Sequence, residues 1–184
     1  MRLCVLSYGS LVKLPCSPAT GHDVYVKQPF KVTSFTLPVR LGMKAYANSN
    51  DNKKICACID SHSPVEVQVY CAESRARDVP DALVYFALRE GCTVQSVGCL
   101  TRNSTVSSSL NIDKASQQRI LDWLHQSEFD VALFADFTCA LSLQQTIRAL
   151  HDSTLRKHTV DYAMNLLPAP AGAELLRMLQ PAFV

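Results

Sequence analysis

The first stretch of the chain that could do chemistry is Tyr8-Gly9-Ser10-Leu11, where the apolar, strand-like run of residues 3–8 breaks off at a Gly-Ser pair. A glycine and a hydroxyl residue at the end of a strand are typical of a tight turn, because glycine supplies the unusual backbone angles. The same residue types can also expose successive backbone N–H groups, which form a concave binding site for an anion. The motif alone leaves both interpretations open.

The second candidate is Glu90, in the sequence FALREG. We predict a helix from about Val79 to Glu90, with Asp78 as its N-cap and Gly91 as its stop signal. The last carbonyl groups of a helix carry partial negative charge, which disfavours an ionised carboxylate beside them. Such an acid can take up and return a proton near neutral pH, as a general acid/base must. The structural alternative for Glu90 is an ion pair with Arg89 or contact with solvent.

Three further residues are weaker candidates. Ser10 as a nucleophile lacks the G-x-S-x-G pattern, and no histidine and aspartate accompany it in a recognisable arrangement. Asp136 ends a continuous apolar run, where an acid can serve chemistry or cap the next turn. Tyr162 could reach a pocket through its hydroxyl, although a tyrosine on a helix face more often packs.

The eight cysteines predict neither a metal site nor a disulfide framework. No C-x-x-C pair occurs, and Cys56 and Cys58 would point to one side of a strand, too close in sequence for a zinc knuckle. Most cysteines lie in apolar runs, where they behave as small hydrophobic residues. The five histidines show no metal-ligand spacing. We therefore expect no metal, no cofactor, no disulfide and a reducing, cytoplasmic location.

Short segments with alternating polarity dominate the first half of the chain and predict strands. These segments are 3–8, 23–27, 31–37, 54–60, 65–72 and, after the helix that ends at Glu90, 92–100. The polar segment 48–54 predicts a hairpin tip. The last third predicts a buried strand at 129–137 and helices at 113–126, 142–151, 154–167 and 171–179. This order of elements predicts an α+β fold with the helices packed outside, in one domain over residues 1–184.

Composition excludes several classes of partner. The chain has 184 residues, 48% of them hydrophobic, and a formal net charge of +2 without a block of lysines and arginines. We therefore expect no nucleic-acid partner. The longest apolar region, VALFADFTCALSL, is interrupted by Asp136 and is too short to span a bilayer, so we expect no membrane partner. The first residues lack a clean signal-peptide pattern, because Tyr8, Gly9 and Ser10 interrupt the apolar run.

Taken together, YGSL near the N-terminus and ALREG after a helix resemble the γ-glutamylcyclotransferase-like superfamily. Further similarity to a bacterial branch lies in QPFKV, in FALREGCTVQSVGCL, in the strand FDVALFADF and in a helix that ends before prolines. The resemblance covers most of the chain in order. The sequence departs from the family pattern at Val97-Gly98-Cys99, at LFADF and at Leu11, where some members have asparagine. These departures concern the choice of substrate.

The resemblance implies a compact, β-barrel-like mixed sheet surrounded by helices. It implies that Tyr8, Gly9, Ser10 and Leu11 form the substrate-binding loop and that Glu90 is the catalytic acid/base. The reaction that it implies is an acyltransferase or lyase step, in which the γ-glutamyl group of a small amide or peptide cyclises to 5-oxoproline and releases an amine. The alternative is a non-catalytic small-ligand-binding or interaction protein of the same fold. The sequence leaves the departing amine and the oligomeric state open.

Overall fold

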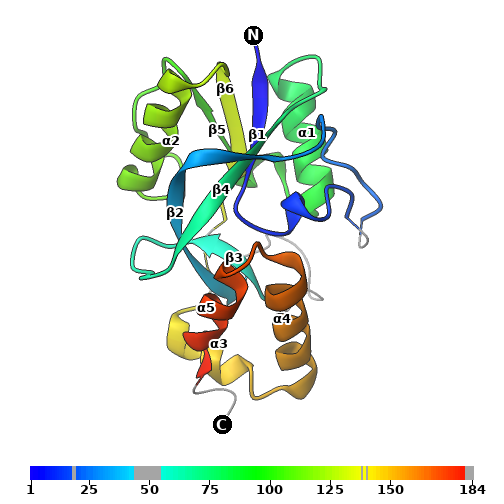
Figure 1. Cartoon of the computed structure of the whole chain (residues 1–184), viewed down its shortest axis with the longest axis vertical. Coiled ribbons are helices and arrows are strands. Elements are labelled where there is room, and N and C mark those ends of the chain that lie inside the picture. Colours follow the sequence, from blue (N-terminus) through cyan, green and yellow to red (C-terminus); the bar gives the residue numbers. More distant parts are fainter. Residues whose placement is uncertain (18–19, 44–54, 138, 140, 181–184) are drawn as a thin grey trace.

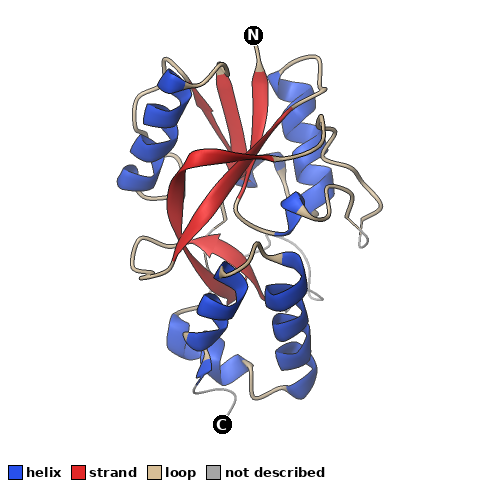
Figure 2. Ribbon diagram, in the orientation of Figure 1, coloured by secondary structure: helices blue, strands red, loops and turns tan. Residues whose placement is uncertain are grey.

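The structure is a computed structural model that describes residues 1–17, 20–43, 55–137, 139 and 141–180. In these residues the chain forms one mixed sheet with helices around it, an α+β fold (Figures 1 and 2). The strands are β1 (Leu3–Ser7), β2 (Lys31–Met43), β3 (Ile55–Ile59), β4 (Glu66–Glu73), β5 (Val97–Thr101) and β6 (Val131–Ala135). The α-helices are α1 (Val79–Glu90), α2 (Lys114–Gln126), α3 (Leu143–Ala149), α4 (Ser153–Leu166) and α5 (Ala171–Arg177), and the 3-10 helices are η1 (Ser10–Val12) and η2 (Val94–Ser96).

The sheet has the strand order β3-β2-β4-β1-β6-β5. Strands β1 and β6 run parallel, and the other neighbouring pairs are antiparallel. The long strand β2 pairs with β4 along its first part and with β3 along its second. Within the described residues the outer strands β3 and β5 do not pair with each other. The sheet is therefore open, and the barrel-like closure that the resemblance implied is absent from the described part of the chain.

Strand β1 is buried on both faces, which explains its nearly continuous apolar sequence. Leu3 and Val5 belong to one core cluster, which α1 completes with the fully buried Phe86. Leu6 belongs to a second cluster, to which α2 contributes the fully buried Ile120. Helices α1 and α2 thus flank the upper part of the sheet in Figure 1, while α3, α4 and α5 gather around the end formed by β2 and β3.

Three of the predicted strands are wrong in place or extent, and one of them, predicted at 31–37, continues to Met43 as β2. Residues 23–27 form no strand, because this segment makes single bridges, Cys16 with Asp23 and Val26 with Ser74, and Tyr25 has a φ of 59°. The strand predicted at 92–100 begins only at Val97, because η2 precedes it. The predicted hairpin tip at 48–54 lies outside the described residues. The helices predicted from periodicity and capping signals are present, with small shifts at their ends.

None of the helices in the described ranges is both long and apolar enough to cross a membrane.

Candidate active site

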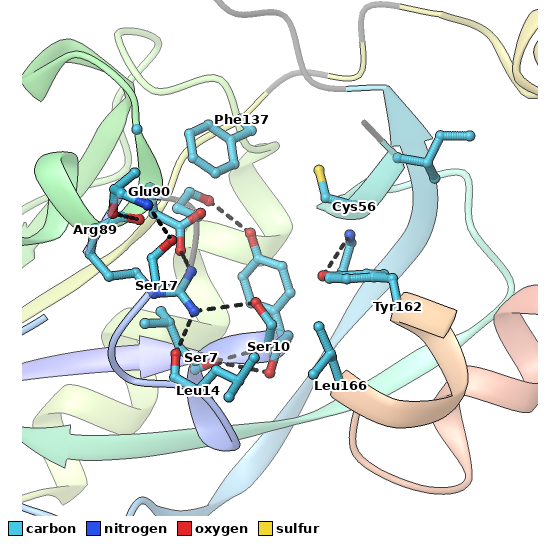
Figure 3. Close-up of a pocket in the computed structure, with 18 of the residues that line it drawn as sticks. Ser7, Ser10, Leu14, Ser17, Cys56, Arg89, Glu90, Phe137, Tyr162 and Leu166 are labelled. Atoms are coloured by element: carbon cyan, nitrogen blue, oxygen red, sulfur yellow. Dashed lines mark hydrogen bonds and ion pairs between the residues drawn. The ribbon is translucent and has the colours of Figure 1, made fainter. Parts of the chain in front are cut away.

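A cavity of about 430 Å³ lies where the ends of β1 and α1 meet β3 and α4 (Figure 3). Its volume is in the range of small-molecule binding sites. The structure brings the turn Tyr8–Leu11 and Glu90 together at this cavity, although they are far apart in the sequence. Both sequence-derived candidates therefore line one site. Figure 3 shows Glu90 and Arg89 on one side of it and Tyr162, Leu166 and Cys56 on the other.

The N-terminal turn is anchored at both of its ends. The Tyr8 hydroxyl donates a hydrogen bond to the carbonyl oxygen of Ala135, at the end of β6, over 2.8 Å. The Gly9 N–H donates to Ser7 Oγ over 3.3 Å, so this amide already has a partner within the turn. The next two residues begin η1, and the first N–H groups of a helical turn have no partner inside that turn. Of the backbone amides of Gly9, Ser10 and Leu11, those of Ser10 and Leu11 are therefore the suitable ones for binding an anion.

Glu90 reaches the cavity because α1 stops immediately after it. Asp78 caps the start of the helix by accepting from the N–H of Asp81. Gly91 adopts the left-handed conformation, with a φ of 64°, and its N–H bonds to the carbonyls of Ala87 and Leu88. A side chain other than glycine is strained in this conformation. The sequence therefore fixes the end of the helix, and with it the position of Glu90.

Arg89 connects Glu90 with the N-terminal turn. Its Nη1 donates to Glu90 Oε1 over 2.6 Å, and the two side chains are only 7% and 9% exposed. Its Nη2 donates to the carbonyl oxygen of Leu14 and lies 3.5 Å from Ser10 Oγ. In the described part of the chain, its buried Nε finds no hydrogen-bond partner. The structural alternative for Glu90, an ion pair with Arg89, is thus present.

The opposite wall of the cavity comes from β3 and α4. The Tyr162 hydroxyl accepts a hydrogen bond from the N–H of Ala57 over 3.2 Å, and Leu166 lies one helical turn further along α4. A Cβ atom placed on Gly9 would be 3.3 Å from the Tyr162 hydroxyl, so the two walls approach closely there. Tyr162 therefore lines the cavity, as the weaker sequence-based interpretation allowed.

Asp136 has a structural role in this arrangement. Its buried carboxylate accepts hydrogen bonds from the N–H groups of Asn111 and Ile112, each over 2.9 Å, and from the Asn111 side chain. Burial raises the pKa of Asp136, and these hydrogen bonds oppose the increase only in part. The carboxylate thus ties the loop before α2 to the end of β6. Its chain neighbours Ala135 and Phe137 line the cavity.

Several residues that line the cavity were not among the site candidates predicted from the sequence. These are Ser7, Ser17, Thr20, Cys56, Arg89, Phe137 and Leu166. Only Arg89 carried a usable signal, because a cation next to a candidate acid is a natural partner for it. The others are ordinary strand, turn or helix residues whose common position depends on how β1, β3 and α4 converge.

Arg89 and Glu90 are the charged residues among those that line the cavity in the described structure. Among the described residues, the rest of the lining is hydroxyl-bearing or apolar, with one thiol at Cys56 and no histidine. In the same described residues, no three histidine, cysteine or acidic side chains are grouped as metal ligands would be. The site thus presents one acid that can exchange protons, one cation beside it and two backbone amides.

Comparisons with known proteins found no matching family model, no similar curated protein and no similar solved structure.

Proposed function

We propose that this protein cyclises the γ-glutamyl group of a small amide or peptide to 5-oxoproline and releases an amine. The observation that carries the proposal is the position of Glu90 and the turn Tyr8–Leu11 on one small cavity. The resemblance to γ-glutamylcyclotransferases in YGSL and ALREG gives the same pair of groups. The open sheet differs from the barrel-like core of that family, so the proposal depends on the site rather than on the fold.

The proposed reaction requires the protein to hold the substrate in a folded conformation and to supply one group that carries protons. The α-amine of a γ-glutamyl compound attacks the γ-carbonyl of the same molecule, which forms the N–C bond of a five-membered ring. The amide C–N bond then breaks. Because the attack is intramolecular, a cavity that holds the compound folded accelerates it. Neither a serine or cysteine nucleophile nor a metal is a participant in this scheme.

Glu90 moves the proton in this scheme. Its carboxylate takes a proton from the α-ammonium group, which frees the amine for attack, and then gives a proton to the departing amine. The hydrogen bond from Arg89 holds the Glu90 carboxylate in place at the cavity before substrate binds. The α-nitrogen goes from an ammonium group to the lactam N–H and so loses two protons in turn. Both protons end on the departing nitrogen, which leaves as an ammonium ion, so the carboxylate is regenerated in each turnover.

The charges of the cavity are suited to the γ-glutamyl end of such a substrate. This end carries an α-ammonium and an α-carboxylate group, and the cavity offers the Glu90 carboxylate beside the Arg89 guanidinium. The N–H groups of Ser10 and Leu11 are placed to bind the substrate carboxylate or the oxyanion that develops on the γ-carbonyl. The apolar lining from Phe137 and Leu166 remains for the departing group.

A second candidate is a binding protein that keeps the cavity without turnover. The buried Arg89–Glu90 pair favours it, because a salt bridge can hold the turn and α1 together without any catalytic role. The enzyme would release 5-oxoproline and the binding protein would not, so this product distinguishes the two functions.

The test is release of 5-oxoproline from a panel of γ-glutamyl amides and dipeptides, measured by mass spectrometry against enzyme-free controls. Cyclisation predicts 5-oxoproline and amine in equal amounts from at least one compound. Saturable binding of a panel member without 5-oxoproline would contradict the enzyme and support the binding protein.

A further inference from the structure

Three thiols lie together beside the cavity, on one face of the pair formed by β2 and β3. In the register of these strands, Arg40 lies opposite Cys58 and Gly42 lies opposite Cys56. The sulfur atoms of Cys56 and Cys58 are 3.6 Å apart. Cys139, from the segment after β6, lies against the same face: a Cβ atom on Gly42 would be 2.5 Å from its sulfur. The absence of a side chain at Gly42 thus makes the room that this third thiol occupies.

The three thiols differ in exposure. Cys58 is fully buried and Cys56 is 8% exposed, whereas Cys139 is partly exposed. A small reagent from solvent therefore reaches Cys139 first, and Cys58 lies behind it. Cys56 faces the cavity, so the cluster extends from the substrate site to the surface.

The charges around Cys139 favour its thiolate form. A hydrogen bond from Cys58 lowers the pKa of Cys139, and the positive charge of Arg40 lowers it further, while burial and the Asp60 carboxylate oppose these effects. Hydrogen bonding to Cys139 and Cys56, together with burial, raises the pKa of Cys58 well above its usual value. The thiolate is the nucleophilic form of cysteine. Cys139 is thus the member of the group that reacts with an electrophilic oxidant, with Cys58 as a protonated neighbour.

We propose that Cys139 is a site of reversible oxidation by peroxides and that Cys58 is its resolving thiol. In the first step the Cys139 thiolate attacks one oxygen of hydrogen peroxide, the O–O bond breaks, and the products are a sulfenic acid and hydroxide, which takes up a proton to become water. In the second step the Cys58 sulfur attacks the sulfenic sulfur, the S–O bond breaks, and a disulfide and a second water form. The peroxide is reduced by two electrons and the two thiols are oxidised.

The link joins Cys58 to Cys139 rather than to Cys56 for a geometric reason. Residues two apart on a strand have Cα atoms about 6.6 Å apart, which is close to the upper limit of about 6.8 Å for a disulfide. Cys139 belongs to a different segment of the chain, so the strand geometry does not fix its distance from Cys58.

The experiment treats the reduced full-length protein with a few equivalents of hydrogen peroxide, traps remaining thiols with iodoacetamide after denaturation, and digests with trypsin without reduction. Cleavage gives peptide 55–75, which holds Cys56, Cys58 and Cys71, and peptide 120–148, which holds Cys139. We expect these two peptides to become linked, with fragmentation locating the bond at Cys58, and dithiothreitol to separate them again. This measurement uses the wild-type protein and needs no variant.

A matched pair of variants tests the order of the steps. Cys139→Ser should slow the loss of the Cys58 thiol at least about tenfold, because the serine cannot form a thiolate. Cys99→Ser, another partly exposed cysteine, should leave the rate unchanged. The proposal is overturned if peroxide oxidises another cysteine as fast as Cys139, if Cys56 and Cys58 link to each other instead, or if Cys139 reaches the sulfinic acid while Cys58 remains alkylatable.

Discussion

In the described part of the chain, two arginine–carboxylate pairs are largely buried, Arg89 with Glu90 and Arg40 with Asp60. The side chains of the first pair are 7% and 9% exposed, and those of the second are 10% and 19% exposed. In each pair one guanidinium nitrogen, Nε of Arg89 or Nη1 of Arg40, has no hydrogen-bond partner in the described residues. By burial and pairing alone, the two are nearly equivalent.

They differ in what the carboxylate faces. Glu90 lines a cavity of about 430 Å³ together with the N-terminal turn. Asp60 accepts from Arg40 and from the N–H and ring of His62, and it holds the connection between β3 and β4. Arg40 also donates to the carbonyl oxygen of Leu141 over 2.9 Å. A buried ion pair therefore indicates a functional site only where an adjacent cavity gives the carboxylate something to act on.

The largest difference should appear in turnover. Glu90→Gln keeps the size of the side chain and an oxygen that can accept from Arg89, but an amide cannot take the α-ammonium proton. We expect turnover of the best γ-glutamyl substrate to fall by about 10²-fold to 10⁴-fold, the range for a removed general base. Asp81→Asn, an acid-to-amide change at the other end of α1, is the matched control and should leave turnover unchanged. Normal turnover in the Glu90→Gln variant would show that the Arg89–Glu90 pair, like the Arg40–Asp60 pair, has only a structural role.

The second pair should show its effect in stability instead. Asp60→Asn leaves the Arg40 guanidinium buried without its charged partner, so we expect the free energy of unfolding to fall by about 2 to 3 kcal/mol. Turnover per folded molecule should not change. Urea denaturation measures the first quantity, and Arg77→Gln, which removes an exposed pair with Asp81, should leave the transition in place. A stable Asp60→Asn protein with lost turnover would reverse the assignment of the two pairs.

The difference between the two ion pairs can also be tested by adding one methyl group at Gly9, in the cavity, or at Gly42, beside Arg40. A Cβ atom on Gly9 would lie 3.3 Å from the Tyr162 hydroxyl in the cavity, and one on Gly42 would lie 3.1 Å from Arg40 Nη1 and 2.5 Å from Cys139 Sγ. Gly9→Ala should raise the KM by less than about tenfold, because groups in the cavity move by only a few tenths of an ångström. Gly42→Ala should lower the melting temperature, at a cost of about 1 to 3 kcal/mol for overpacking, without changing the KM. The opposite pattern would mean that Gly42 rather than Gly9 lies at the binding site.

The smallest effect is the pH dependence that Asp60 contributes. Burial by itself would raise the pKa of Asp60, but hydrogen bonds from Arg40 and from the His62 N–H outweigh it and leave the pKa below its usual value. A carboxyl with a lowered pKa in the folded state stabilises the protein above its unfolded pKa and loses that contribution as the pH falls through the folded pKa. The stability difference between wild type and Asp60→Asn should therefore shrink as the pH falls below about 4. A difference that stays constant down to pH of about 2 would contradict this account of Asp60.

The elements that carry the site could be predicted from the sequence because their signals are local. Asp78 and Gly91 fix the two ends of α1, and the helix from Val79 to Glu90 has the predicted bounds. Strand β1 ends at Ser7, one residue before the predicted end at Tyr8, and the turn follows at the Gly-Ser pair. Each of these signals acts over a few residues and does not depend on the rest of the fold.

Features that depend on distant contacts could not be predicted in this way. The failed strand at 23–27 has the right polarity pattern, but its backbone departs from the β-region at Tyr25 and makes only single bridges. Two long-range contacts illustrate this: Cys58 hydrogen-bonds to Cys139, and the Tyr162 hydroxyl lies close to Gly9. No local sequence pattern relates the segments that these contacts bring together. The local sequence indicates small hydrophobic residues for the cysteines, whereas the hydrogen bond from Cys58 and the charge of Arg40, which lower the pKa of Cys139, come from other segments of the chain.

The most direct test of the proposed reaction follows oxygen atoms in water enriched in ¹⁸O. Intramolecular cyclisation does not consume water, so we predict 5-oxoproline and amine in equal amounts, without ¹⁸O in the 5-oxoproline and without glutamate. The Glu90→Gln variant should form 5-oxoproline far more slowly than the wild-type protein. Glutamate that carries ¹⁸O would show hydrolysis of the γ-glutamyl bond by attack of water. That result would contradict the central claim, that the cavity between Glu90 and the N-terminal turn folds a substrate onto its own amine.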